Sequence, residues 1–124
     1  MILTPPRTIL LLSLLYPMGA LPQGSQLEVI QKPVAAQHLD GTVRMHWDGQ
    51  PVSNVHVEEC DSGWKDVLAS TQTDSRGHFH LTPLGNRPLH YIKIYAPGFN
   101  IREYRVRLSK RARPELELEI NVGT

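Results

Sequence analysis

The sequence predicts an all-β protein: a seven-stranded antiparallel Greek-key β-sandwich, preceded by a signal peptide. Apolar residues recur at every second position in short runs from Gly41 to the C-terminus. Each run ends at a turn signal such as Asp48-Gly49, and no helix-period run of useful length follows residue 20. Period two places one face of each strand in a core. Several such strands at short intervals are typical of an antiparallel sandwich or barrel.

The first 20 residues have the character of a secretory signal peptide. Arg7 is the one charged residue before an apolar run over 9–16, and the small residues Gly19 and Ala20 follow it. A membrane span needs about 20 apolar residues, so this run is too short to be one. We therefore expect a secreted or periplasmic protein with no transmembrane segment in the mature chain. A retained N-terminal anchor and an ordinary buried helix are the alternatives.

The mature chain is expected to hold a linker over residues 21–37, rich in proline and with a short strand at 27–30, and one domain over residues 38–124. This length suffices for a single core without disulfides or metal. Removing Arg7 with the leader leaves twelve basic and twelve acidic residues. Such a balance argues against nucleic acid as a partner.

Seven segments of the domain alternate between apolar and polar residues, and most are bounded by Gly, Pro, Asp or Ser. They are residues 41–47, 55–59, 67–73, 78–81, 90–95, 101–108 and 115–122. The residues expected to face the core are Val43, Met45, Trp47, Val55, Val57, Phe79, Leu81, Ile92, Ile94, Tyr104, Val106, Leu108, Leu116, Leu118, Ile120 and Val122. Val67, Ala69 and Thr71 are expected to share one face of their strand.

Two hairpins are expected within this set. Asp48-Gly49 is a strong hairpin dipeptide after the first strand, because both positions tolerate positive φ. The last two strands are expected to pair across 109–114, with Arg105 and Arg107 opposite glutamates of the final strand. Opposite charges on paired strands stabilise by roughly 0.2–1 kcal/mol each. The basic run 102–113 is therefore interpreted as a solvated sheet face, with a polyanion-binding patch as the alternative.

The turn and core residues resemble the carboxypeptidase regulatory-like domain, a transthyretin-like β-sandwich. The matching segments are Gly41-Thr42-Val43, residues 49–52, residues 71–79 and residues 91–99, and the resemblance covers 41 to about 108. Members of that family look like non-catalytic modules beside secreted peptidases, receptors and adhesins. The resemblance implies a structural spacer or a module that contacts proteins or glycans.

Residues 87–92 and 96–99 are similar to the C-terminal signature of intradiol ring-cleavage dioxygenases, which bind ferric iron through two Tyr and two His. His90 matches the first His, but Ile92 occupies the second position and Trp64 stands where a Tyr ligand would be expected. Neither Ile nor Trp coordinates ferric iron. We therefore expect no catalytic residues, no cofactor and no metal site. A degenerate or active metal-dependent enzyme of that sandwich class is the alternative.

The histidines and the single cysteine offer further candidate chemistry. His78 and His80 share a face and, with His46 or His56, would form an adventitious Zn²⁺ or Cu²⁺ site; exposed imidazoles are the favoured interpretation. His90 is expected at the core edge with its ring N–H satisfied. Cys60 is interpreted as a buried apolar residue, and an intermolecular disulfide is its alternative.

The expected binding surface is the outer face of two strands, formed by Tyr91, Lys93, Tyr95, Arg105 and Arg107. Aromatic residues on an exposed strand are frequent contact anchors, and they are equally often cross-strand partners. The leading hypothesis is thus an exported non-catalytic module in the bacterial envelope or outside the cell. Its expected partner is an unknown protein or glycan, and the expected state is a monomer or weak oligomer. A self-assembling subunit joined by Cys60 or by sheet edges is a third hypothesis.

Overall fold

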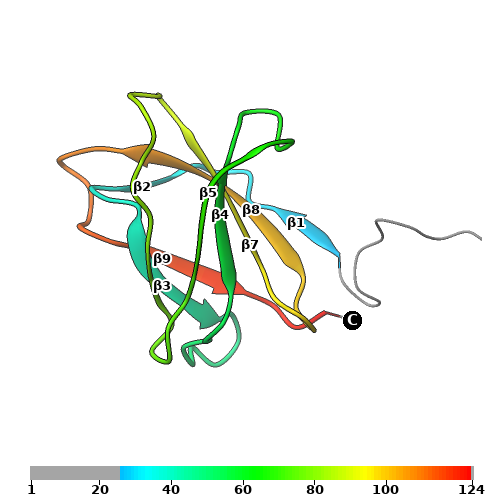
Figure 1. The fold of residues 1–124 in the computed structure, drawn as a ribbon. Helices are drawn as coiled ribbons and strands as arrows, with labels where there is room; N and C mark the ends of the chain where they lie inside the picture. Colours follow the sequence, from blue (N-terminus) through cyan, green and yellow to red (C-terminus); the bar gives the residue numbers. More distant parts are fainter. Residues whose placement is uncertain (1–25, 124) are drawn as a thin grey trace, which may run out of the picture.

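The computed structural model describes residues 26–123, which form two β-sheets and no helix (Figure 1). The strands are β1 (Leu27–Val29), β2 (Val34–Ala36), β3 (Asp40–Met45), β4 (His56–Cys60), β5 (Val67–Gln72), β6 (His78–His80), β7 (His90–Tyr95), β8 (Ile101–Leu108) and β9 (Leu116–Ile120). The expected signal peptide, residues 1–20, and the first part of the expected linker lie outside the described residues.

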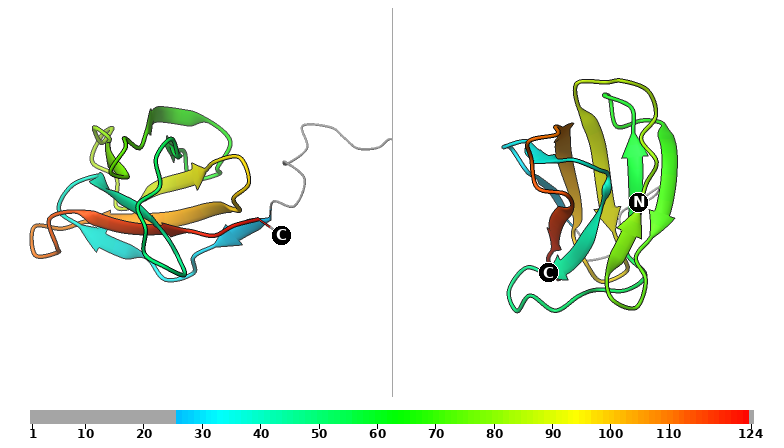
Figure 2. Two further views of the ribbon diagram at one scale, coloured as in Figure 1. Left: turned by 90° about the horizontal axis from the view of Figure 1, so that it is seen from below. Right: turned by 90° about the vertical axis from the view of Figure 1, so that its left-hand side faces the viewer.

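The larger sheet has the order β1-β8-β7-β4-β5, and β2 also pairs with β8. The smaller sheet has the order β6-β3-β9. The teal β3 and the red β9 lie beside each other in both views of Figure 2, as their pairing requires. The buried apolar side chains of both sheets form one cluster, so the two layers share a single core.

Alternation along the strands explains this core. In β7 the pattern buries His90, Ile92 and Ile94, and in β9 it buries Leu116, Leu118 and Ile120. Removing one such aliphatic side chain from water contributes about 1.5–3 kcal/mol. The predicted all-β class is therefore confirmed, and the apolar face of each of these strands was predicted correctly.

The described residues hold nine strands, where seven were expected in the domain and a short one at 27–30; β1 confirms that short strand, and β2 was not expected. β1 and β2 lie inside the segment expected to be a linker, and both run parallel to β8. Leu27 is opposite Ile101, and Val34 is opposite Val106. The N–H of Ile30 still donates to the Glu103 carbonyl at 3.0 Å, and the chain leaves the ladder only over 31–33, where Pro33 has no N–H to donate. Because β3 also pairs in parallel with β9, the sheets are mixed rather than purely antiparallel.

One expected hairpin forms over a short stretch, and the one expected across 109–114 is wrong. At Asp48-Gly49 the chain reverses with Gly49 at φ 74°, the N–H of Met45 donates to the Gln50 carbonyl at 2.7 Å, and an antiparallel bridge joins Arg44 to Pro51. However, β3 pairs with β6 and β9, whereas β4 belongs to the other sheet. Likewise β8 and β9 lie in different sheets. Each connection crosses from one layer to the other, which a local turn signal does not reveal.

The glutamates of β9 therefore have other partners than Arg105 and Arg107. Arg44 Nε lies 3.6 Å from Glu117 Oε1, and His46 Nδ1 lies 2.7 Å from Glu119 Oε1. These contacts join β3 and the residue after it to β9. The glutamates of β9 do lie beside basic side chains, as expected, but these contacts join β9 to β3 rather than to β8.

Two residues expected in the core are instead largely exposed. Trp47 is 78 % exposed and Val122 49 %. Trp47 and Val122 follow the last residues of β3 and β9, Met45 and Ile120. Period two stops describing the side-chain direction where the strand ends, so the predicted inward position of Trp47 is wrong.

Candidate functional site

An open cleft of about 560 Å³ lies at one end of the two sheets. Its lining residues, which define the Trp47 cleft, are Gln26, Glu28, Trp47, Asn100, Asn121 and Val122. They come from both ends of the described chain, from the turn after β3 and from the loop between β7 and β8. The volume lies within the range of about 300–1,000 Å³ that is usual for ligand pockets.

Strand pairing brings these distant segments together. Glu28 on β1 is opposite Arg102 on β8, so both side chains point to the same side of the larger sheet. The backbone N–H of Asn100 donates to the carbonyl of Asn121 at 2.9 Å. A bridge between Phe99 and Val122 continues this contact between the sheets.

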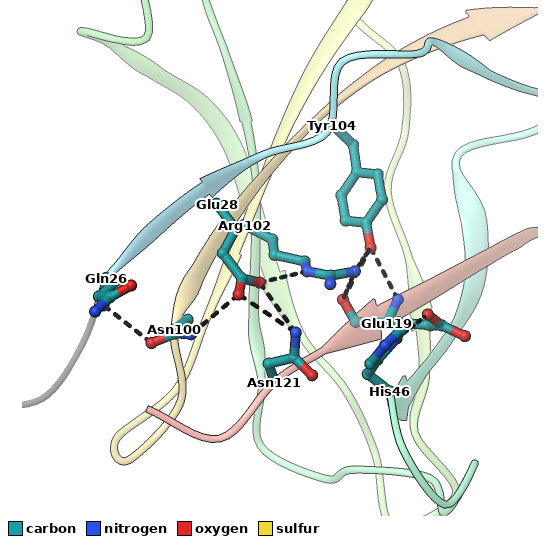
Figure 3. Close-up of polar contacts among 8 residues, drawn as sticks. All are labelled: Gln26, Glu28, His46, Asn100, Arg102, Tyr104, Glu119 and Asn121. Carbon is teal, nitrogen blue, oxygen red and sulfur yellow. Dashed lines mark hydrogen bonds and ion pairs between the residues drawn. The ribbon is translucent and has the colours of Figure 1, made fainter. Parts of the chain in front are cut away.

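Glu28 is the centre of a hydrogen-bond network (Figure 3). Arg102 Nε donates to Glu28 Oε1 at 2.7 Å, and Asn100 Nδ2 donates to Oε2 at 3.1 Å. Asn121 Nδ2 lies 3.4 and 3.3 Å from the two carboxylate oxygens. Burial alone would raise the pKa of Glu28, but the bonds from Arg102, Asn100 and Asn121 outweigh it and lower that pKa. Glu28 is therefore a firmly held carboxylate.

A second layer of contacts fixes Arg102. Its Nη1 donates to Tyr104 Oη at 3.0 Å and to the Glu119 carbonyl at 3.2 Å. Tyr104 Oη in turn donates to that carbonyl at 2.8 Å and accepts from the Glu119 N–H at 3.0 Å. Burial disfavours the charge on Arg102, yet the bonds with Glu28 and Tyr104 outweigh it and raise its pKa. The polar floor of the cleft is thus rigidly supported by both sheets.

Trp47 forms an exposed wall on an ordered stretch of backbone. The N–H of His46 donates to the Ile120 carbonyl at 3.0 Å. The N–H of Gly49 donates to the Met45 carbonyl at 2.9 Å. Trp47 lies between these two anchors, so its backbone position is set before any ligand arrives.

The predicted binding surface, Tyr91, Lys93, Tyr95, Arg105 and Arg107, lies on the outer face of β7 and β8. Strand alternation brings all five to that face, since the intervening residues of β7 are buried. No observation tests whether they bind a partner, and this assignment stays a prediction.

Several of these side chains are already engaged within the chain. Tyr95 Oη donates to Glu58 Oε2 at 2.6 Å, and its ring stacks on His56 with centroids 4.8 Å apart. The bond to Glu58, with burial, raises the pKa of Tyr95 to about 12. Tyr91 meets Trp64 edge to face, with centroids 5.4 Å apart. Partners of this kind leave less of each ring for a ligand than Trp47 offers.

A separate buried cluster joins β4, β7 and the loop before β7. Glu59 is fully buried. Its Oε2 accepts a hydrogen bond from Arg87 Nη2 and lies 2.6 Å from His90 Nδ1. The prediction that His90 lies against the core with a satisfied ring nitrogen is confirmed. Glu59 Oε1 and Arg87 Nε have no hydrogen-bond partner among the described residues.

The other candidate chemistry is dispersed. His80 pairs with Asp40, and His46 pairs with Glu119. Within residues 26–123 no three His, Cys, Asp or Glu side chains gather where they would hold a metal ion. Cys60 is buried and free, and burial raises the pKa of its thiol.

Sequence reasoning missed the polar members of the Trp47 cleft. One signal was available: Tyr104, Val106 and Leu108 were assigned to the core, and the same alternation places Arg102 in the core register. A buried arginine requires an acidic partner. Nothing local identified that partner as Glu28, which lies 74 positions away in the sequence.

Comparisons with known proteins add no family assignment: no protein-family model matches the chain, and no curated protein matches it. In residues 26–123, no helix has the length and apolar character that crossing a membrane requires.

Proposed function

We propose that this protein is an exported, non-catalytic β-sandwich module that binds a partner in the Trp47 cleft. The observation that carries this proposal is the exposure of Trp47 beside an ordered polar floor. A large aromatic side chain left in water at a fixed position is a typical contact anchor. The floor supplies hydrogen-bonding groups whose positions the fold has already set, so binding would order few additional groups.

The proposal includes a relationship to the carboxypeptidase regulatory-like domains, as a Greek-key, transthyretin-like sandwich. Turn and core residues over 41–108 support this relationship. The expected partner is a protein or a glycan outside the cytoplasm, and the leader-like residues 1–20 support export. Sequencing the N-terminus of the exported product tests that part, since a cleaved leader leaves a chain that begins near residue 21.

Binding is tested with the full chain immobilised and exposed to a native envelope fraction. Trp47→Ala should retain several-fold less protein or glycan than the wild type, because it removes the wall of the cleft. Val67→Ala is the matched control, since it truncates an exposed apolar side chain on β5, at the opposite edge of the larger sheet. Equal retention by Trp47→Ala and wild type would show that the cleft is not the binding site.

Two further measurements separate this proposal from its alternatives. Alanine at Tyr95 and at Arg105 tests the outer face of β7 and β8, and should leave retention unchanged if the cleft is the site. Stoichiometric iron in the purified protein would contradict the non-catalytic assignment and favour a metal-dependent enzyme.

A further inference from the structure

The Trp47 cleft is electrically balanced. Among the described residues that line it, Glu28 alone is charged. Its partner Arg102 is held 2.7 Å away and is largely buried behind it. The carboxylate and the guanidinium together carry no net charge. A free anion or cation entering the cleft would therefore meet no uncompensated opposite charge. A neutral ligand does not depend on such an attraction.

The carboxylate of Glu28 is also a poor metal ligand in this arrangement. Both its oxygens already accept hydrogen bonds, from Arg102, Asn100 and Asn121. A metal ion would have to displace those donors and would lie close to a guanidinium. The cleft thus lacks the freely available oxygen donors on which hard cations depend.

The remaining polar groups suit hydroxyl ligands. Asn121 Oδ1 and the side-chain amide of Gln26 have no hydrogen-bond partner among residues 26–123. They offer hydrogen-bond acceptors and donors to a ligand in the cleft. A hydroxyl group is both donor and acceptor, so a row of hydroxyls matches such a mixed set better than a group of one kind.

The apolar part of the cleft supplies the complementary surface. Trp47 and Val122 are both substantially exposed there. A pyranose or furanose ring has a face of C–H groups and a rim of hydroxyls. The C–H face can cover an indole ring while the rim reaches polar side chains beside it.

From this combination we infer that the Trp47 cleft binds a neutral carbohydrate, with the sugar ring against Trp47 and its hydroxyls on Asn121 and Gln26. This inference rests on the proposed function, because it names the ligand class of the same site. A protein segment is the competing occupant, and the experiment distinguishes the two.

The test uses the full chain with Trp64→Phe, which leaves Trp47 as the single tryptophan. The probes are neutral oligosaccharides built from hexoses, pentoses or N-acetylhexosamines, with uronic-acid oligomers as a charged comparison. At least one neutral probe should shift the Trp47 emission in a saturable manner, and uronic-acid oligomers should bind more weakly. Adding Asn121→Ala should weaken binding several-fold. In a Trp64-containing background, Trp47→Ala should weaken binding about tenfold or more, measured by calorimetry. The matched control, Val67→Ala, should bind like its parent.

The outcomes separate the inference from the function beneath it. Saturable binding of a neutral probe that depends on Trp47 supports both. If no neutral probe binds, or if charged probes bind more tightly, the carbohydrate inference is overturned. If envelope protein is still retained in a Trp47-dependent manner, the proposed binding function stands and only the carbohydrate inference is overturned. If neither sugar nor envelope material depends on Trp47, both fail. Circular dichroism of each variant establishes that the sheets are intact.

Discussion

Replacing Arg87 by Met should destabilise the domain far more than most single substitutions, because it leaves a buried charge unpaired. Glu59 is fully buried, and Arg87 supplies the cation beside it. Removing one partner of a buried ion pair costs roughly 3–5 kcal/mol. The Arg87 side chain is 30 % exposed, so water screens part of the interaction and the lower end, about 3 kcal/mol, is expected.

That loss is large for a domain of this size. Single domains unfold with about 5–15 kcal/mol, so Arg87→Met would remove a substantial fraction of the stability. At about 4–8 °C per kcal/mol for a domain of up to 100 residues, the midpoint of thermal unfolding should fall by roughly 12–24 °C. Urea unfolding followed by circular dichroism measures the free energy directly.

The double variant Glu59→Gln/Arg87→Met identifies the cause. Glu59→Gln removes the charge and leaves Arg87 able to reach water, so it should cost about 1 kcal/mol. The double variant should then resemble Glu59→Gln rather than the sum of both changes. His90 Nδ1 also lies 2.6 Å from the carboxylate, so the coupling between Glu59 and Arg87 is measured with His90 unchanged in every variant. A loss below 0.5 kcal/mol, or strict additivity, would refute this account.

Three further predictions concern a close strand contact and the shifted pKa values of Tyr95 and Glu28. Gly41→Ala would place a Cβ 2.2 Å from a carbonyl oxygen of β9, so it should cost roughly 1–3 kcal/mol in urea unfolding. Gly63→Ala, whose Cβ meets nothing closer than 4.0 Å, should change little. Tyr95 should ionise at about pH 12 in an ultraviolet titration, and Glu58→Gln should lower that value. Because the folded pKa is raised, its stabilisation is complete below the usual value of 10.0 and is lost as the pH rises to about 12. The pKa of Glu28 is lowered, so its contribution is present above pH 4.5 and lost as the pH falls through the folded value. Glu28→Gln should flatten that acid limb of the unfolding free energy, and an unchanged limb would contradict the network.

Most of the strand positions could be predicted, but which strands pair with one another could not. Ile92 and Ile94 are fully buried as the alternation requires, because the direction of a side chain from an extended strand depends on local geometry alone. The pairing of β3 with β9 depends instead on which of several similar apolar faces meet. Turn signals such as Asp48-Gly49 indicate where the chain reverses and not which sheet it joins next.

The candidate site was harder to predict from the sequence than the strand positions were. Trp47 was assigned to the core because the alternation was extended two residues beyond the strand. Glu28 was not predicted as a site residue, because its segment is short and a carboxylate on an exposed strand is common. Its importance comes from Arg102 and Asn121, which are distant in sequence and adjacent only after both sheets have formed.

The sequence by itself determined that this domain is built of strands and which residues of most strands are buried, because a two-residue period is a local property of extended chain. Only the tertiary structure decided how the strands pair, that Trp47 lies in water, and that Glu28 meets Arg102. The pairing of β3 with β9 and the contact of Glu28 with Arg102 join segments more than seventy residues apart, and many pairings of similar apolar faces are compatible with the same local pattern.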